Sequence, residues 1–409
     1  MQPDLQGIIP SMLHYDVIVS GLGPGGATAA YELGRAGLSV LAIDKKSFPR
    51  YKPCGGGLSA RIGGLLTPDF QSTVERTIKG VCFWYPGKGN FTLYAPEPIA
   101  YMVTRERFDH FLVLKAKANG VELREGESIS KIEEQEDSVE VTTNAAQYKG
   151  KILIGADGAH SLTARVLNPK SSRRRILALE EEIPLEGEQL NPGSSPQADE
   201  VLIDLGSAPG GYAWSFPKST RLSVGIGSFS GYQRSLLHRF SIFKASHHMH
   251  QQSPRKNPTG HPVPVFDPKP LTLASQRILL VGDAANLVDP FMGEGIYYAI
   301  QSSQIAAATV VEAIKGGRIN CSLYQERITQ EMYPEFRAAE KLARLCYAFP
   351  QLWYEAMQRY PEVSRWLYEV LQGFESYPGL LRRLKSEVRR LFKSSLREKI
   401  GSVLKKLTP

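Results

Sequence analysis

The 409-residue chain has only four cysteines, and no two of them form a C-x-x-C pair. Their spacing signals neither a dithiol redox centre nor a zinc site, and we expect no bound metal. No apolar run reaches the roughly 18–20 residues that a bilayer-spanning helix needs. The first thirteen residues lack the basic-then-apolar pattern of a signal peptide. These absences predict a protein that is cytoplasmic, or peripheral on the cytoplasmic face of a membrane.

Acidic residues are scarce at the end of the chain. The formal net charge is +8, and all of it lies in a tail from Leu380 to Pro409 that holds ten Lys/Arg and two Glu. Apolar residues recur every three or four positions there, and most basic residues fall between them. This pattern is typical of a basic amphipathic helix on an anionic membrane surface, and also of a helix packed on its own domain. No nucleic-acid recognition motif accompanies the charge, so we expect no nucleic-acid partner.

A glycine-rich loop stands near the start of the chain. Residues 15–20 predict a buried strand, residues 21–26 read G-L-G-P-G-G, residues 27–36 predict a helix, and a second strand ends at Asp44. In a G-x-G-x-x-G loop the first glycine permits a tight turn, the second lets the backbone approach a pyrophosphate, and the third lets helix and strand pack closely. The helix N-terminus attracts phosphate, and Asp44 is placed to bind a ribose. The segment predicts dinucleotide binding.

Two later segments indicate that the dinucleotide is FAD. Residues 155–161, with Asp157 and Gly158, resemble the DG motif of flavoprotein hydroxylases. The pair Gly282-Asp283 resembles the second FAD motif of the same proteins. No second G-x-G-x-x-G loop is present for a nicotinamide cofactor. We therefore expect NADPH or a reduced electron carrier to act only as a transient donor.

Two shorter patterns support this interpretation. The turn at residues 293–295 precedes a predicted helix, whose N–H groups can stabilise negative charge on a reduced flavin. Residues 105–109 match the R-x-x-F-D segment of the same superfamily, although a surface salt bridge would give the same pattern.

Aromatic residues alternate in one later segment. Residues 209–217 read P-G-G-Y-A-W-S-F-P. On a strand alternate side chains share a face, so Tyr212, Trp214 and Phe216 form one aromatic wall. Such a wall suits a long hydrocarbon, but alternation also suits the core of a sheet. Residues 48–66, rich in Gly, Pro and basic residues, predict a loop that crosses the cofactor.

These segments together resemble the geranylgeranyl reductase family, within the p-hydroxybenzoate-hydroxylase-like flavoproteins. The resemblance covers residues 15–316. Residues 209–217 match the family pattern P-x-x-Y-x-W-x-F-P, and residues 50–57 match R-x-K-x-C-G-G-G. Enzymes of this family that act on chlorophyll precursors carry K-P-C-G-G-A-I-P-L, whereas this chain continues as Gly57-Leu58-Ser59. It is more similar to the bacterial and archaeal branch, which leaves the natural substrate open.

The resemblance implies an α/β fold. We expect a Rossmann-like FAD-binding domain of the three-layer glutathione-reductase type, an inserted antiparallel-sheet substrate domain and a C-terminal helical region. Residues 14–66, 101–170 and 271–316 would form the FAD-binding domain and residues 67–100 and 171–270 the substrate domain. Residues 317–409 would form the helical region with its basic tail.

The resemblance also implies a reaction. The protein would be an FAD-dependent reductase that saturates C=C bonds of a polyprenyl chain, of the geranylgeranyl type, by hydride transfer from N5 of the reduced flavin. Its substrate would be a prenyl lipid or prenyl diphosphate, and we expect a monomer. A flavin monooxygenase or halogenase is an alternative, because the halogenase pattern W-x-W-x-I-P is close to residues 212–217. A non-catalytic lipid-binding flavoprotein is another.

The predicted site residues fall into three groups. Catalytic candidates are Cys54, Tyr212 and Trp214. Substrate-binding candidates are Tyr212, Trp214, Phe216 and Pro217. Cofactor-binding candidates are Gly21, Gly23, Pro24, Gly25, Gly26, Asp44, Lys45, Arg50, Cys54, Gly55, Gly56, Arg105, Asp157, Gly158, Gly282, Asp283, Pro290, Gly293, Gly295 and Ile296.

Overall fold

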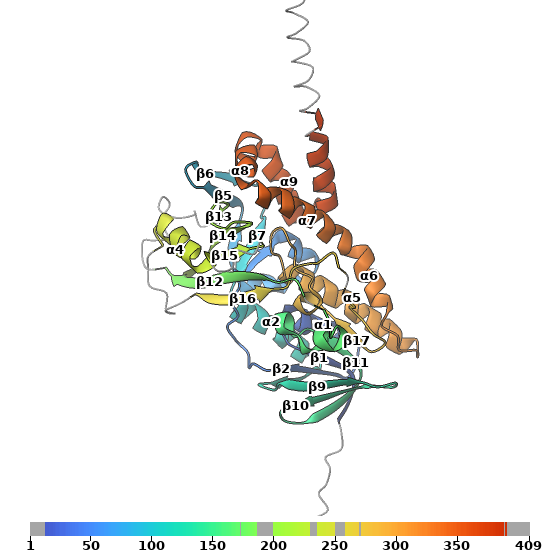
Figure 1. The fold of residues 1–409 in the computed structure, drawn as a ribbon. Helices are drawn as coiled ribbons and strands as arrows, with labels where there is room; N and C mark the ends of the chain where they lie inside the picture. The colour runs from blue at the N-terminus through green and yellow to red at the C-terminus, as the bar shows by residue number, and fades with distance from the viewer. Residues whose placement is uncertain are drawn as a thin grey trace, which may run out of the picture.

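The computed structural model describes residues 13–171, 173–185, 199–229, 235–249, 258–269, 271–387 and 389–390. These residues form two large sheets, a small sheet between them, and helices that pack on both (Figure 1). The predicted α/β class and the helical C-terminal region are confirmed. The division into domains at the predicted boundaries stays a prediction.

The first large sheet has a parallel centre. Its strands, in order, are β8 (Glu122–Glu125), β2 (Val40–Asp44), β1 (Leu13–Ser20), β11 (Gln147–Gly155), β10 (Val139–Thr143) and β9 (Ile129–Glu134), and β17 (Ile278–Leu280) also pairs with β11. The pairs among β8, β2, β1, β11 and β17 are parallel, and β9 and β10 add an antiparallel edge. The core strands are apolar because both faces are covered. The parallel pairing brings the ends of β1, β11 and β17 to one edge.

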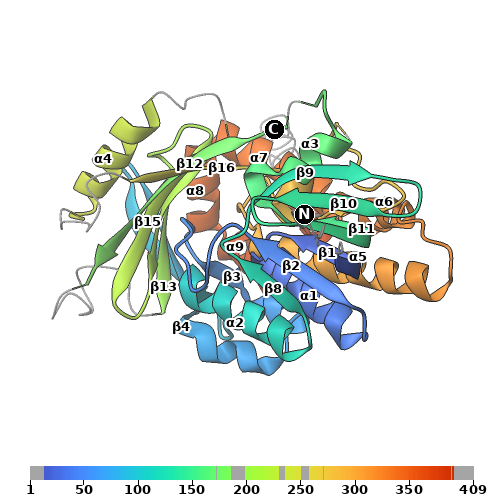
Figure 2. The same cartoon turned by 90° about the horizontal axis from the view of Figure 1, so that it is seen from below.

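Helices α1 (Pro24–Arg35), α2 (Arg105–Ala118) and α5 (Ile296–Lys315) lie together on this sheet (Figure 2). Helix α1 begins at Pro24, three residues earlier than predicted, because proline is well accommodated in the first turn of a helix. Its buried glycines and alanines allow α5 to approach closely. A Cβ atom on Gly25 would lie 3.0 Å from Ser303 Oγ of α5. This close packing holds the glycine loop against the second FAD segment.

The second large sheet carries the aromatic segment. Its strands, in order, are β16 (Thr259–Val263), β12 (Ile176–Pro184), β15 (Arg221–Ser228), β14 (Gly211–Pro217), β13 (Glu200–Asp204), β5 (Gly80–Tyr85) and β6 (Gly89–Tyr94). All neighbours are antiparallel except β13 and β5, which are parallel. Helix α4 (Leu236–Ser246) packs its apolar residues on one face of this sheet. The other face of the sheet is directed toward the predicted cofactor-binding segments.

The small sheet lies between the large ones. It consists of β3 (Gly57–Ser59), β7 (Ala100–Val103) and β4 (Val74–Ile78). The predicted loop 48–66 therefore contains a short strand and a 3-10 helix, Ala60–Gly64. This strand fixes one end of the loop that carries Cys54.

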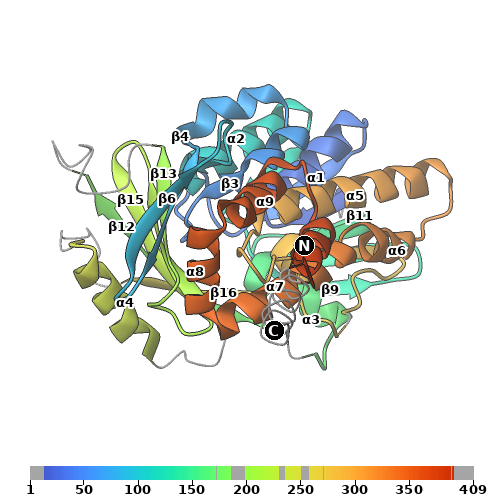
Figure 3. The same cartoon turned by 90° about the horizontal axis from the view of Figure 1, so that it is seen from above.

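The remaining chain is helical: α6 (Leu323–Glu331), α7 (Tyr333–Ala348), α8 (Pro350–Arg359), α9 (Pro361–Gln372) and a further helix from residue 377. Figure 3 shows α8 and α9 beside the second large sheet. Tyr354 of α8 and Tyr368 of α9 donate hydrogen bonds to backbone carbonyls of β6, at 3.1 and 2.9 Å. These helices therefore close one side of that sheet.

The predicted basic tail begins inside the folded body. Leu380 is completely buried, and Arg383 forms ion pairs with Glu369 and Glu375 at 2.6 and 3.0 Å. The first turns of the tail thus pack on the protein, which is the second of the two interpretations offered by the sequence. Residues 391–409, which hold the rest of the tail, lie outside the described residues. Within the described residues, no helix combines the length and apolar character needed to cross a bilayer.

Candidate active site

The predicted cofactor segments meet at one edge of the parallel sheet. The N–H of Ala156 donates to Ser20 O at 2.8 Å, and that of Val281 donates to Gly155 O at 3.0 Å. The glycine loop, the 155–161 segment and Gly282-Asp283 are thereby adjacent although they are far apart in sequence. The carboxyl edge of parallel strands is where an open α/β sheet binds its ligand.

The three glycines of the G-x-G-x-x-G pattern have different surroundings. Gly21 has a φ of +92°, and a Cβ atom there would lie 2.5 Å from Ala156 O. A Cβ on Gly26 would lie 1.8 Å from Gly21 O. A Cβ on Gly23 would instead approach only Nη2 of Arg50, at 3.7 Å. Gly21 and Gly26 are needed for packing, whereas Gly23 leaves the space that an approaching pyrophosphate requires.

Arg50 brings an unsatisfied donor to this loop. Its Nη2 atom lies 3.1 Å from Asp109 Oδ2, while its Nη1 atom is buried and has no hydrogen-bond partner within the described part of the chain. A buried donor without a partner is unfavourable. An anionic pyrophosphate beside Gly23 and the N-terminus of α1 would satisfy it. The residues present therefore fit the phosphate groups of FAD.

The R-x-x-F-D segment is buried rather than a surface salt bridge. Arg105 is 4% exposed and donates two hydrogen bonds of 2.7 Å to Asp109. Burial alone lowers the pKa of Arg105, but the Asp109 carboxylate and the Cys54 sulfur outweigh it and raise the pKa well above its usual range. Asp109 thus holds both Arg50 and Arg105 beside the glycine loop.

The acidic residues of the three motifs are held by the backbone. Asp44 accepts the N–H of Leu22 at 2.8 Å. Asp157 accepts the N–H groups of residues 162 and 163, at 2.7 and 3.1 Å, at the start of α3 (Leu162–Leu167). Asp283 faces the cavity described below and lies 3.8 Å from the ammonium group of Lys52. Their proposed contacts with FAD stay predictions.

Three tyrosine hydroxyls hold the turn at residues 289–294, before α5. Tyr212 donates to the carbonyl of residue 292 at 2.5 Å, and Tyr347 of α7 donates to that of residue 291. Tyr377 donates to the carboxylate of Asp289. Burial raises the pKa of Asp289 to about 6, although the hydrogen bonds from Tyr377 and from the N–H of Phe291 oppose it. The turn that faces the predicted flavin is therefore fixed from three separate elements.

One cavity of about 360 Å³ joins the cofactor edge to the second large sheet. From the predicted site it is lined by Pro24, Cys54, Gly55, Gly56, Arg105, Asp283, Gly293, Gly295, Ile296, Tyr212, Trp214 and Phe216. Farther from the cofactor edge its lining is mostly apolar, with residues such as Phe83, Ile99 and Ile203. The alternating aromatic side chains of β14 therefore form one wall of this cavity.

The loop with Cys54 packs directly on this wall. A Cβ atom on Gly55 would lie 2.9 Å from the ring of Phe216 and 3.2 Å from Nε1 of Trp214. The Cys54 sulfur accepts the N–H of Gly56 at 3.4 Å. The loop and the aromatic strand together therefore form the narrow boundary between the cofactor edge and the apolar part of the cavity.

Comparison with known proteins agrees with this geometry. A family model described as an FAD binding domain matches residues 14–177. Digeranylgeranylglycerophospholipid reductase 1 of Methanopyrus kandleri is 30% identical over 363 residues, spanning 81% of this chain and 91% of the relative. The digeranylgeranylglycerophospholipid reductase of Thermoplasma volcanium is 31% identical over 359 residues, spanning 81% and 88%. This chain belongs to the geranylgeranyl reductase family. It is an FAD-binding oxidoreductase.

Solved structures show how far the family fold extends. A geranylgeranyl bacteriochlorophyll reductase-like protein from Thermoplasma acidophilum superposes with a TM-score of 0.70 at 25% identity, covering 92% of this chain and all of that one. The superposed region is longer than residues 15–316, so it also includes C-terminal helices. A flavin-dependent brominase has a TM-score of 0.69 at 20% identity over 92% of this chain and 99% of its own, which is a likeness of fold alone.

In this family member the C-terminal helices also line the cavity, which the sequence did not indicate. The lining residues there are Cys346, Tyr347, Trp353, Leu367, Tyr368 and Leu371. Apolar residues at helical spacing are equally expected in an ordinary core. No local signal distinguishes a cavity wall from a core.

Some predicted residues lie apart from the cavity. Lys45 is exposed beside Asp44, and Pro290 and Pro217 are buried, and none of the three lines the cavity. His247 is half-buried, with Nε2 3.3 Å from Asp204 and its ring against Trp84.

Proposed function

We propose that this protein is an FAD-dependent reductase that saturates C=C bonds of a polyprenyl chain. One observation carries the proposal: a single, mostly apolar cavity runs from the cofactor segments along the aromatic face of β14 to α9. An apolar cavity of this kind favours a long hydrocarbon over a small polar substrate.

Bound FAD, once reduced, would supply a hydride to one carbon of the double bond. The chain's own residues would hold the prenyl chain in a dry environment, orient the double bond and supply a proton to the second carbon. Trp214 and Phe216 would flank the double bond, and Tyr212 would also hold the flavin-facing turn. The substrate would be a prenyl lipid or prenyl diphosphate, and the donor NADPH or a reduced electron carrier.

We propose that Cys54 contributes to the reaction from its place between Arg105 and the aromatic wall. Cys54→Ser should slow substrate reduction while flavin content stays unchanged. Cys82→Ser is a matched control, because Cys82 lies on β5 between two cavity-lining residues and does not itself line the cavity. Equal turnover in both variants would remove Cys54 from the mechanism.

The reaction itself is tested by anaerobic incubation of reduced enzyme with geranylgeranyl diphosphate, followed by lipid extraction and mass spectrometry. We expect products heavier by two hydrogens for each saturated bond. A product that forms only when O₂ is present, and carries oxygen or halogen, would support a monooxygenase or halogenase instead. Absence of any product despite bound FAD would support a lipid-binding flavoprotein.

A further inference from the structure

Glu180 of β12 faces the cavity, on the same face of the sheet as the aromatic wall. It pairs across the sheet with Gly225 of β15, which in turn pairs with Trp214 of β14. A Cβ atom on Gly225 would lie 2.1 Å from the indole ring of Trp214, so the ring extends across β15. Glu180 and Trp214 both line the cavity. The sheet therefore presents one carboxyl group next to the aromatic wall.

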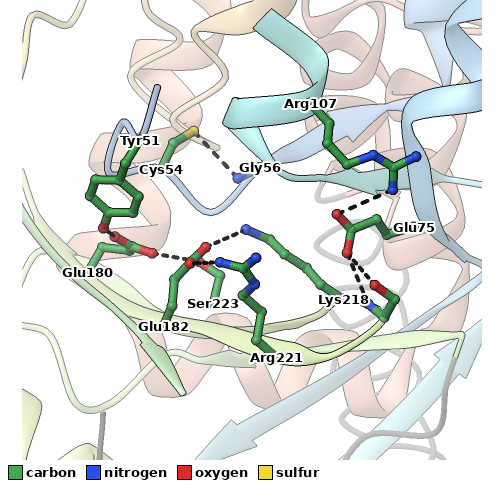
Figure 4. A network of polar contacts seen from close by, with 11 residues as sticks. Tyr51, Cys54, Gly56, Glu75, Arg107, Glu180, Glu182, Lys218, Arg221 and Ser223 are labelled. Atoms are coloured by element: carbon green, nitrogen blue, oxygen red, sulfur yellow. Dashed lines mark hydrogen bonds and ion pairs between the residues drawn. The ribbon is translucent and has the colours of Figure 1, made fainter. Parts of the chain in front are cut away.

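Neutral hydroxyl groups hold this carboxyl group (Figure 4). Tyr51 donates a hydrogen bond of 2.6 Å to Oε2, and Ser223 donates one of 3.2 Å to Oε1. Tyr51 lies three residues before Cys54, in the loop that packs on the aromatic wall. The carboxyl group is thereby anchored to the loop as well as to the sheet.

The cationic side chains near Glu180 form ion pairs with a second glutamate, Glu182. Lys218 and Arg221 both form ion pairs with Glu182, the lysine at 3.1 Å. Burial raises the pKa of Glu180 to about 7, and the charge of Glu182 adds to this effect. The hydrogen bonds from Tyr51 and Ser223 and the charge of Lys218 oppose it. A large fraction of Glu180 is therefore protonated at neutral pH.

The neighbouring histidine in the cavity is a poor acid by comparison. His261 of β16 lines the same cavity, but burial and the charge of Lys52 lower its pKa to about 4. It is therefore neutral at pH 7 and has no acidic proton to give. Two cations also line the cavity on its cofactor side. Arg105 donates a hydrogen bond to Asp109, and the ammonium group of Lys52 lies 3.8 Å from Asp283.

We propose that Glu180 is the acid that protonates the double bond, an assignment that rests on the proposed reductase function. One carbon of the C=C bond receives the hydride supplied by reduced FAD, and the other receives the proton of the Glu180 carboxyl group. The π bond is replaced by two C–H bonds, FAD is left oxidised, and Glu180 is left as a carboxylate that regains a proton from water. Tyr51 and Ser223 position the carboxyl group.

The test compares wild type with Glu180→Gln and with Glu181→Gln as a matched control. Glu181 is the next residue of β12, but it points to the opposite side and pairs with Lys244 of α4 at 2.7 Å. Each enzyme, reduced anaerobically, is mixed with geranylgeranyl diphosphate, and the return of oxidised flavin absorbance is followed. Glu180→Gln should be slower by about 100-fold or more, with FAD content unchanged.

The pH profile separates an acid from a merely structural residue. Reoxidation by wild type and by Glu181→Gln should slow as pH rises through about 7, and the residual rate of Glu180→Gln should not change there. Tyr51→Phe removes a hydrogen bond that lowers the pKa of Glu180, so its midpoint should move to higher pH.

Infrared spectroscopy gives a readout that needs no substrate. In the difference spectrum between oxidised wild type and Glu180→Gln, a carboxylic-acid C=O stretch should appear and should disappear as pH rises through about 7. Absence of this band, or equal reoxidation rates in Glu180→Gln and Glu181→Gln, would overturn the assignment. Wild-type enzyme that shows the band but never reacts with the prenyl substrate would contradict the proposed function, and the assignment with it.

Discussion

At the scale of single residues, two glycines of one loop serve different purposes. Gly26 packs so closely on the carbonyl of Gly21 that no side chain can be added without moving α1. Gly23 has open space before it, an ordinary φ of −66° and Arg50 nearby. The first constraint comes from the protein's own packing, and the second from the predicted contact with the pyrophosphate of FAD.

The two positions should therefore respond differently to substitution. We expect Gly23→Val to fold but to purify without FAD, because its side chain would occupy the pyrophosphate space. Gly26→Ala should lower the free energy of unfolding by more than about 2 kcal/mol even when both proteins are compared without FAD. Absorbance at the flavin bands and chemical denaturation measure the two effects. A yellow Gly23→Val protein would contradict the loop assignment.

The raised pKa of Glu180 should also make the free energy of unfolding depend on pH. This pKa is about 7 in the folded protein and 4.5 ordinarily, so between these values the folded protein keeps a proton that the unfolded chain has released. The stabilising contribution is fully present below 4.5 and is lost as pH rises through about 7. It amounts to up to about 3 kcal/mol.

Denaturation at pH 5 and pH 8 measures this contribution. Glu180→Gln should lose less free energy of unfolding between the two values than wild type does, and Glu181→Gln should behave like wild type. If Glu180→Gln shows the same loss as wild type, the raised pKa is wrong.

At the scale of elements, the helix that starts at residue 377 is attached to the turn at residues 289–294, which is predicted to face the flavin. The hydroxyl of Tyr377 donates to Asp289, and both residues are fully buried. This turn also receives hydroxyl groups from β14 and α7. The C-terminal helices are therefore attached to the predicted cofactor site, although they follow the predicted FAD-binding segments in sequence.

Removing that single hydroxyl should weaken the attachment. We expect Tyr377→Phe to lower the free energy of unfolding by about 1–3 kcal/mol, because it removes the hydroxyl donor from a buried carboxyl group. The affinity for FAD should also fall, as measured by fluorescence titration of the apoprotein. Tyr360→Phe is a control, since Tyr360 is 39% exposed on the same helical region. Equal effects of the two substitutions would argue against the attachment.

At the scale of the whole molecule, the basic tail divides into two parts. Leu380 is buried, and Leu381 and Leu384 pack against the apolar core of the body. Residues 391–409 hold five basic residues and Glu398, a balance of +4. A truncation meant to test membrane contact should therefore end at Arg390, because an earlier end would remove part of the core.

We expect the full-length chain to float with liposomes of anionic lipid and the chain ending at Arg390 to float less. Each basic residue near such a surface contributes roughly 1 kcal/mol, and salt should weaken the binding. Liposomes of neutral lipid serve as the control. Equal flotation of the two chains would remove residues 391–409 from membrane binding.

The sequence by itself determined the cofactor segments and the aromatic strand. Short patterns such as G-x-G-x-x-G reflect local backbone requirements, and alternation along a strand decides which side chains share a face. The strand–helix–strand pattern of residues 15–44 agreed with the α/β class, and the family resemblance implied that class and the helical C-terminal region. The role of the aromatic face as a cavity wall came from the family resemblance, because alternation alone is equally consistent with a packed core.

Only the tertiary structure decided which other residues share the site. Glu180 lies in a run of three glutamates whose members are equivalent in sequence. Its pairing with Gly225, which pairs in turn with Trp214, places it on the cavity face, while Glu181 points to α4. Likewise, Trp353 and Tyr377 become part of the site through packing between distant segments. The physical reason is that burial, charge and pKa depend on neighbours in space, which a linear pattern does not specify.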